Sequence, residues 1–154
     1  YEGGLRVPFI AVGPRIKPGS QSRVPVTGLD LFPTLAELAG YAKPLPKSLD
    51  GGSLTRLLRN QGQGAVQRSN SFLLFHQAVA RTAQTALIHG DYKLVKTWRD
   101  NRLELFDLSK SVEEDINLAE KLPGKTEELH GLMTGHLDNV GAETRKITTK
   151  RANQ

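Results

Sequence analysis

The feature that most constrains the fold is a series of strand-like segments joined by very short turns. Gly90 and Asp91 separate two such segments, and a two-residue loop that begins with glycine is typical of a type II′ hairpin turn. Residues 92–98 alternate in polarity, which predicts a half-buried strand with Lys93 on its solvated face. The sequence therefore predicts an antiparallel meander of about four strands, at residues 72–76, 85–89, 92–98 and 103–108.

Two helical patterns follow the predicted meander. Ser111 and Glu114 have the spacing of a capping box, which predicts a short helix that runs to Ala119. After Pro123 the apolar residues recur at helical spacing, so the longest helix is expected there. Its predicted apolar stripe consists of Leu129, Leu132, Met133, Leu137 and Val140.

The first third of the chain has a different pattern. Its apolar run at residues 7–12 predicts a short buried strand. The spacing of Leu31, Leu35 and Leu38 predicts a short buried helix, with Asp30 as its N-cap. Residues 60–70 are polar and rich in glycine and glutamine, so the best internal boundary is expected there.

Composition excludes several classes of function. The net charge of the 154 residues is +5, but residues 143–154 hold four basic side chains against one acidic, and we expect them to form a disordered basic tail. Without this tail the net charge is only +2, and no aromatic residues alternate with the basic ones, so we expect no nucleic-acid partner. No apolar run approaches the roughly 20 residues needed to span a bilayer, so no membrane partner is expected. The absence of cysteine excludes disulfides and a thiol nucleophile in this chain.

Four stretches in this order resemble the sulfatase family within the alkaline-phosphatase superfamily. They are Tyr1-Glu2-Gly3-Gly4-Leu5-Arg6-Val7-Pro8, residues 29–40, residues 50–58, and residues 90–119 with their Gly-Asp-Tyr-Lys-Leu-Val motif. The resemblance implies an α/β parent fold of the alkaline-phosphatase and sulfatase type. Residues 1–62 would then be the final strand, helix and connector of an incomplete catalytic domain. Residues 63–142 would be a C-terminal α+β subdomain, with an antiparallel sheet of about four strands and a long C-terminal helix.

The same resemblance implies the chemistry of the intact enzyme. Sulfatases hydrolyse sulfate esters with a calcium ion and a formylglycine, which is made from the first residue of a Cys/Ser-x-Pro-x-Arg motif. This chain has no such motif, and the family's calcium ligands and catalytic lysine fall outside the matching stretches. We therefore assign no catalytic residue and no metal ligand, and we expect no turnover from this chain alone. The family implies a sulfated small molecule or glycan as substrate, and a periplasmic, secreted or lysosomal location.

His76 is the one candidate substrate-binding residue, because many sulfatases carry a substrate-contacting histidine at the end of this strand. A local hydrogen bond at the strand end explains a histidine there equally well. Glu2 and Arg6 are interpreted as an ion pair that fixes the first turn. His130 and His136 lie six residues apart, which does not match the four-residue spacing of a helical metal pair, so no metal site is expected. Position 88, where the family often has arginine, is an isoleucine.

Two other functions remain open at this point. The chain could be a stand-alone binding or oligomerisation module that self-associates through exposed sheet edges. It could also be part of a phosphatase or phosphonate hydrolase of the same superfamily, which would differ from a sulfatase in its nucleophile.

Overall fold

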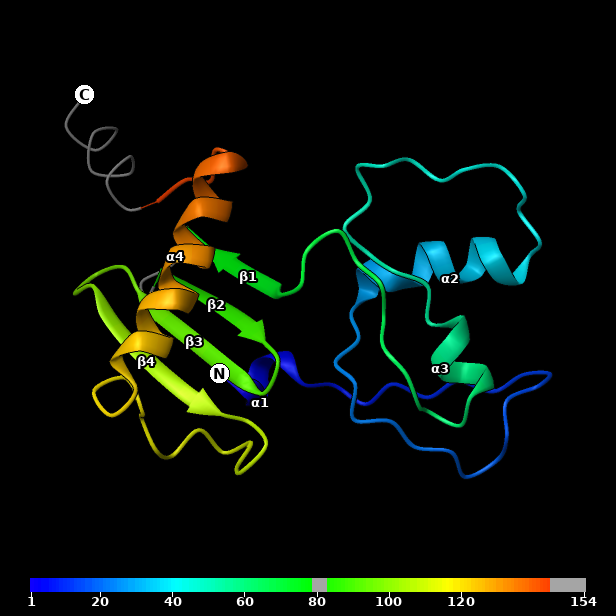
Figure 1. Cartoon of the computed structure of the whole chain (residues 1–154), viewed down its shortest axis with the longest axis horizontal. Coiled ribbons are helices and arrows are strands. Elements are labelled where there is room, and N and C mark those ends of the chain that lie inside the picture. Colours follow the sequence, from blue (N-terminus) through cyan, green and yellow to red (C-terminus); the bar gives the residue numbers. More distant parts are fainter. Residues whose placement is uncertain (79–82, 145–154) are drawn as a thin grey trace. The chain divides into compact units, whose positions relative to one another are not determined.

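The computed structural model describes residues 1–78 and 83–144, and these form two compact units (Figure 1). The first unit combines Tyr1–Val7 with the part of the chain from Phe72 onward, and the second is Pro8–Ser71. The domain boundaries at residues 62 and 142 stay predictions. Residues 145–154, which make up most of the predicted tail, lie outside the described residues.

The first unit is built on a four-stranded antiparallel sheet with the strand order β1-β2-β3-β4. Consecutive strands are neighbours, with Leu87 opposite Leu94 and Leu94 opposite Leu105. The predicted meander and its glycine-first turn are confirmed, since Gly90 has a φ of +59°. The strands are β1 Leu73–Gln77, β2 Gln84–His89, β3 Tyr92–Thr97 and β4 Arg102–Asp107.

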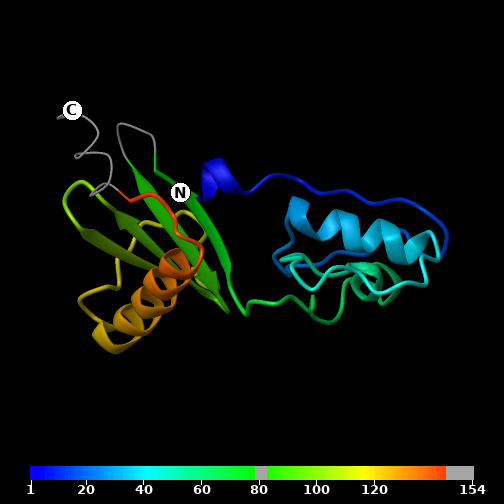
Figure 2. The ribbon, with the colours of Figure 1, turned by 90° about the horizontal axis from the view of Figure 1, so that it is seen from above.

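Both faces of this sheet are covered. The long helix α4, Pro123–Asn139, packs on one face, as Figure 2 shows. Side chains alternate along a strand, so the other face carries a second cluster, against which α1, Glu2–Leu5, packs through Leu5. The α4 cluster consists of Leu87, Leu94, Leu105, Leu129, Met133 and Leu137, and the α1 cluster of Ala86, Val95 and Phe106.

Three expectations for this unit are wrong. Lys93 is fully buried rather than solvated, because α1 covers the face of β3 that was expected to meet water. Val140 lies just beyond α4 and is exposed. No helix follows Ser111: its hydroxyl accepts a hydrogen bond from the Glu113 amide, but Glu114 has a φ of +57°, which a helix does not allow.

The second unit contains the 3₁₀ turn η1, Gly28–Asp30, followed by α2, Leu31–Leu38, and α3, Thr55–Arg59. Asp30 is the N-cap residue of α2, as predicted, but its side chain makes no capping hydrogen bond to that helix. The side chain instead belongs to a capping box that begins at Thr27, of which Asp30 is the third helical residue. Gly40, with a φ of +72°, ends the helix in a Schellman motif, in which the Tyr41 amide donates to the Ala36 carbonyl.

The predicted burial of this second unit is wrong. Residues 7–12 form no strand, and Ile10 and Val12 are 85% and 93% exposed. The apolar stripe of α2 is exposed as well, at Leu31, Phe32, Leu35 and Leu38. A strand requires a neighbouring strand for its backbone hydrogen bonds, and the described part of the chain supplies none to residues 7–12.

Among the described residues, no helix is both long and apolar enough to cross a membrane.

Candidate functional site

His76 lies on β1 with both ring nitrogens occupied. Its Nε2 is 2.8 Å from the Glu143 carbonyl oxygen, which can only accept, so this nitrogen carries the proton. Nδ1 shares a hydrogen bond with the Thr85 hydroxyl at 2.7 Å, and Thr85 Oγ1 accepts from Trp98 Nε1 at 2.8 Å. The ring is therefore held in one orientation by a relay of polar groups.

A hollow of about 280 Å³ borders His76 on the first unit. It is lined by Tyr1, His76, Gln77 and Gln84, next to apolar side chains of the α1 cluster and its surroundings: Leu5, Phe75, Ala86 and Val95. Neutral amides and an imidazole can donate hydrogen bonds to a polar ligand such as a sugar, but they supply no fixed positive charge for a sulfate group.

The strongest electrostatic feature of this unit is a buried cluster around Lys93. Its Nζ lies 2.7 Å from Glu2 Oε1 and 2.9 Å from Glu114 Oε1, and the lysine side chain has no exposed surface. The contact with Glu114 is an ion pair without hydrogen-bond alignment. Arg6 Nε contacts the other oxygen of Glu2 at 3.0 Å. Two carboxylates and two cations thus balance one another, as a buried charge requires.

These contacts also fix the first turn of the chain. The Glu2 amide donates to the Glu114 carboxylate, and the Tyr1 hydroxyl donates to Glu104 Oε2 at 2.9 Å. Burial raises the pKa of Glu2, but hydrogen bonds from Lys93 and Arg6 outweigh that effect, and the pKa lies below its ordinary value. The structure therefore supports Glu2 and Arg6 as an ion pair that fixes the turn. A hollow of about 490 Å³ lies beside it, lined by Tyr1, Glu2, Gly3, Arg6, Val112, Glu113 and Glu114.

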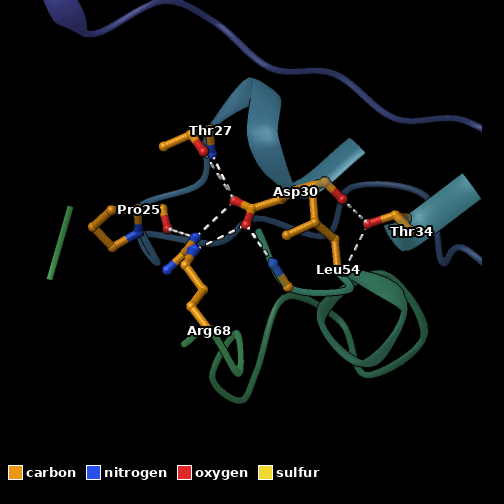
Figure 3. A network of polar contacts seen from close by, with 7 residues as sticks. Pro25, Thr27, Asp30, Thr34, Leu54 and Arg68 are labelled. Atoms are coloured by element: carbon orange, nitrogen blue, oxygen red, sulfur yellow. Dashed lines mark hydrogen bonds and ion pairs between the residues drawn. The ribbon is translucent and has the colours of Figure 1, made fainter. Parts of the chain in front are cut away.

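A second buried ion pair organises the other unit (Figure 3). The Asp30 carboxylate accepts two hydrogen bonds from Arg68, from Nε at 2.8 Å and from the terminal nitrogen at 2.7 Å. It also accepts from the amides of Thr27 and Gly52, at 2.8 and 2.9 Å. Burial raises the pKa of Asp30, but these hydrogen bonds outweigh it and keep the pKa below its ordinary value.

This network joins three segments that are distant in sequence. The Asp30 carbonyl accepts from the Thr34 hydroxyl, whose oxygen in turn accepts from the Leu54 amide at 2.8 Å. Arg68 also donates to the Pro25 carbonyl. Four N–H donors occupy the carboxylate oxygens of Asp30, which leaves no free acceptor site for a metal ion, so the role of Asp30 is structural.

The remaining histidines do not form a metal site. His130 Nε2 lies 2.8 Å from Lys96 Nζ, and burial followed by the charge of Lys96 lowers the pKa of His130. His136 packs its ring edge-on against Phe72. Within residues 1–78 and 83–144, no three His, Cys, Asp or Glu side chains are grouped to hold a metal ion.

Sequence reasoning missed the partners that matter most in both networks. Lys93 and Glu114 were assigned to a solvated face and to a helix, and no role was assigned to Arg68. Lys93 follows Tyr92 and precedes Leu94 and Val95, so three apolar neighbours in a central strand were the one signal of its burial. Nothing local to Arg68 indicates its partner, since Asp30 lies 38 residues away.

Comparisons with known proteins identify the family. The family model described as "N-sulphoglucosamine sulphohydrolase, C-terminal" matches residues 1–142. The chain belongs to this sulfatase C-terminal family. It is 33% identical to arylsulfatase K of Xenopus laevis over 138 residues, which cover 84% of this chain and 25% of that protein. A sulfatase of Formosa agariphila is 35% identical over 136 residues, which cover 81% of this chain and 25% of that protein.

A solved structure also supports the fold. A protein solved in complex with its substrate, D-glucosamine-2-N,6-O-disulfate, has a TM-score of 0.65 and 23% identity to this sulfatase chain, covering 80% of it and 26% of that protein. The expected fold, a C-terminal α+β subdomain of a sulfatase, is therefore confirmed. The chain spans about a quarter of the length of the curated relatives that it matches.

Proposed function

We propose that this chain is the C-terminal quarter of an enzyme that hydrolyses sulfate esters of a sugar or aryl compound, and that it shapes one side of the substrate pocket. The observation that carries this proposal is the match of the sulfatase C-terminal model to residues 1–142. The substrate of the structural neighbour, a sulfated glucosamine, supports a sulfated glycan as the substrate class.

The catalytic groups belong to the preceding part of such an enzyme. The resemblance implies a formylglycine and a calcium ion, but the residues of this chain fit neither group. The sequence has no Cys/Ser-x-Pro-x-Arg motif, and the described residues hold no cluster of metal ligands. We therefore expect residues 1–154 to be inactive alone, and no catalytic step is assigned to them.

The exposed apolar residues of the second unit and of Val7, which directly precedes it, support this proposal. Apolar side chains point to both faces of the extended segment, with Val7 and Phe9 at odd positions and Ile10 and Val12 at even ones. A strand that is apolar on both faces is typical of a sheet with helices on either side. We infer that residues 7–12 add a strand to the main α/β sheet of the intact enzyme, and that the α2 stripe packs on this sheet.

His76 is the proposed contact of this chain with the substrate. Its Nε2–H now donates to the Glu143 carbonyl, so a substrate oxygen would have to replace that acceptor. Replacing His76 by alanine in the longer polypeptide should then raise KM for the sulfate ester by about tenfold, the value of one lost hydrogen bond. An unchanged KM would show that His76 serves only the relay to Thr85 and Trp98.

The test of the proposed function compares two polypeptides. The product of the whole open reading frame and residues 1–154 alone are assayed for sulfate release from an aryl sulfate and from N- and O-sulfated glucosamine. We expect release only by the longer product. Hydrolysis of an aryl phosphate or phosphonate ester in place of the sulfate esters would assign the enzyme to the other branch of the superfamily. Sulfate release by residues 1–154 would contradict the proposal.

Self-association is the second proposal, and it applies to the isolated chain. Exposed apolar residues on α2 and on residues 7–12 favour contact with a second copy when the preceding polypeptide is absent, as does an open sheet edge. Sedimentation velocity of residues 1–154 at several concentrations should show a rising average mass. A monomer at every concentration would contradict this proposal.

A further inference from the structure

The buried cluster around Lys93 joins three segments of unequal rigidity. Lys93 is the second residue of β3, an inner strand that is paired on both sides. Glu2 belongs to α1, a single turn of four residues, which is too short to be stable by itself. Glu114 belongs to an irregular stretch in which it has a φ of +57°. The strand is thus the rigid element, and the two segments that carry Glu2 and Glu114 depend on contacts with it.

The contacts reach across long distances in the sequence. The bond from Lys93 to Glu2 spans 91 residues, and the bond from the Glu2 amide to Glu114 spans 112. Tyr1 adds an edge-on contact with the Phe106 ring and its hydrogen bond to Glu104. The whole stretch Tyr1–Arg6, which we call the anchor segment, is therefore held by the sheet, and Lys93 supplies the only buried cation among the described contacts of Glu2.

The anchor segment continues directly along the chain into residues 7–12. The family model is that of a C-terminal region, and the chain spans a quarter of its relatives. If the proposed function holds, the anchor segment connects the C-terminal sheet to the catalytic part of the enzyme through residues 7–12, which are proposed to join the main sheet of that part. We propose that Lys93 is a positioning residue: it fixes where the catalytic part joins the C-terminal sheet by holding Glu2 and Glu114 on the face opposite α4.

A positioning role for Lys93 differs from a contribution to the stability of the sheet itself. The strands are paired by their own backbone hydrogen bonds, and the α4 face has its own apolar cluster. Loss of the cluster should therefore release the anchor segment and leave the sheet folded. A displacement of about 1 Å in a part that carries catalytic groups can lower a rate by about a hundredfold.

The first test uses hydrogen exchange of residues 1–154. Lys93→Met is compared with the unchanged chain and with Lys110→Met, a matched control, since Lys110 is exposed and pairs only with Asp107 among the described residues. In Lys93→Met we expect the amides of Glu2, Gly4 and Arg6 to exchange at least tenfold faster, with strands β2 and β3 unchanged. Unchanged exchange of the anchor segment would overturn the proposal.

A second variant covers the case in which Lys93→Met leaves two buried carboxylates that unfold the sheet. In the triple variant Lys93→Met, Glu2→Gln, Glu114→Gln no buried charge remains without a partner, so the sheet should keep its protection while the anchor segment loses it. Loss of protection throughout the sheet in this variant would show that the cluster stabilises the whole unit, and would overturn the positioning role.

The kinetic test uses the longer polypeptide. Lys93→Met should lower kcat for an aryl sulfate by tenfold or more with a smaller change in KM, and Lys93→Arg, which keeps the charge, should recover part of the loss. An unchanged kcat, or a change confined to KM, would overturn the proposal. If the unchanged longer polypeptide hydrolyses no sulfate ester, the proposed function fails, while the exchange experiment still decides whether Lys93 holds the anchor segment.

Discussion

The two units of this chain bury their apolar residues to very different degrees. In the sheet unit, Leu87, Leu94 and Leu105 have no exposed surface, and both faces of the sheet are covered by helices of the same chain. In the unit formed by Pro8–Ser71, most large apolar side chains of α2 face solvent. The first unit contains a large apolar core, whereas the second buries Leu54 and Leu57 beside the polar network around Asp30. The difference agrees with the proposal that the second unit packs against polypeptide outside this chain.

The largest expected effect tests that polar network. Asp30→Ala leaves the largely buried Arg68 side chain, which is 13% exposed, without its carboxylate partner, and removing one member of a buried ion pair costs up to about 3–5 kcal/mol. We expect the second unit to unfold while the sheet unit keeps its melting transition. Proteolysis with trypsin, followed at Arg56 and Arg59, measures the loss. Asp50→Ala, at an exposed carboxylate, is the control and should change stability by less than about 0.5 kcal/mol.

Two leucines then compare the units directly. Leu94→Ala in the sheet core should cost about 2–5 kcal/mol in denaturant unfolding of residues 1–154. Leu35→Ala on α2, where the side chain is 63% exposed, should change the stability of the same chain by less than about 0.5 kcal/mol. In the longer polypeptide Leu35→Ala should also become costly. Equal effects of Leu35→Ala in both polypeptides would mean that nothing covers the α2 stripe.

Acid should weaken both units together, because each depends on a carboxylate whose pKa is lowered. Glu2 and Asp30 have pKa values below their ordinary range, so their contribution to stability is present above pH about 4–5 and is lost as the pH falls through the lowered values. Urea unfolding between pH 7 and pH 2 measures this dependence. Stability that rises on acidification would contradict the assignment of both carboxylates as charged and paired.

The smallest effect concerns two glycines. Gly135 lies inside α4, where the methyl group of an alanine would meet open space, so Gly135→Ala should stabilise the sheet unit by about 1 kcal/mol. Gly40 also has open space, but its φ of +72° disfavours alanine, so Gly40→Ala should destabilise the second unit. Thermal unfolding checks both signs. A stabilising Gly40→Ala would show that the Schellman end of α2 is not required.

The parts of the fold that the sequence predicted are those set by local signals. The Gly90 turn, the alternation of β3 and the apolar stripe of α4 each depend on neighbours within a few residues, and all three elements formed where predicted. The capping box at Ser111 is also local, but it predicted a helix that does not form, because the Glu114 side chain pairs with Lys93 instead. A contact between β3 and a distant loop prevailed over a local preference.

The candidate site was harder to predict, because its decisive contacts connect distant residues. Glu2 and Lys93 are 91 residues apart, and Asp30 and Arg68 are 38 apart. No periodicity or spacing rule connects such pairs. For His76 the sequence left substrate contact and a local hydrogen bond open, and the structure shows local bonds at both ring nitrogens. The substrate role stays a prediction.

The most direct test of this account is hydrogen exchange at residues 7–12, measured in residues 1–154 and in the longer polypeptide. If this segment completes a sheet with preceding polypeptide, its amides should exchange quickly in the isolated monomer and at least about a hundredfold more slowly in the longer product. Strong protection of these amides in a monodisperse monomer of residues 1–154, or fast exchange in both polypeptides, would contradict the account.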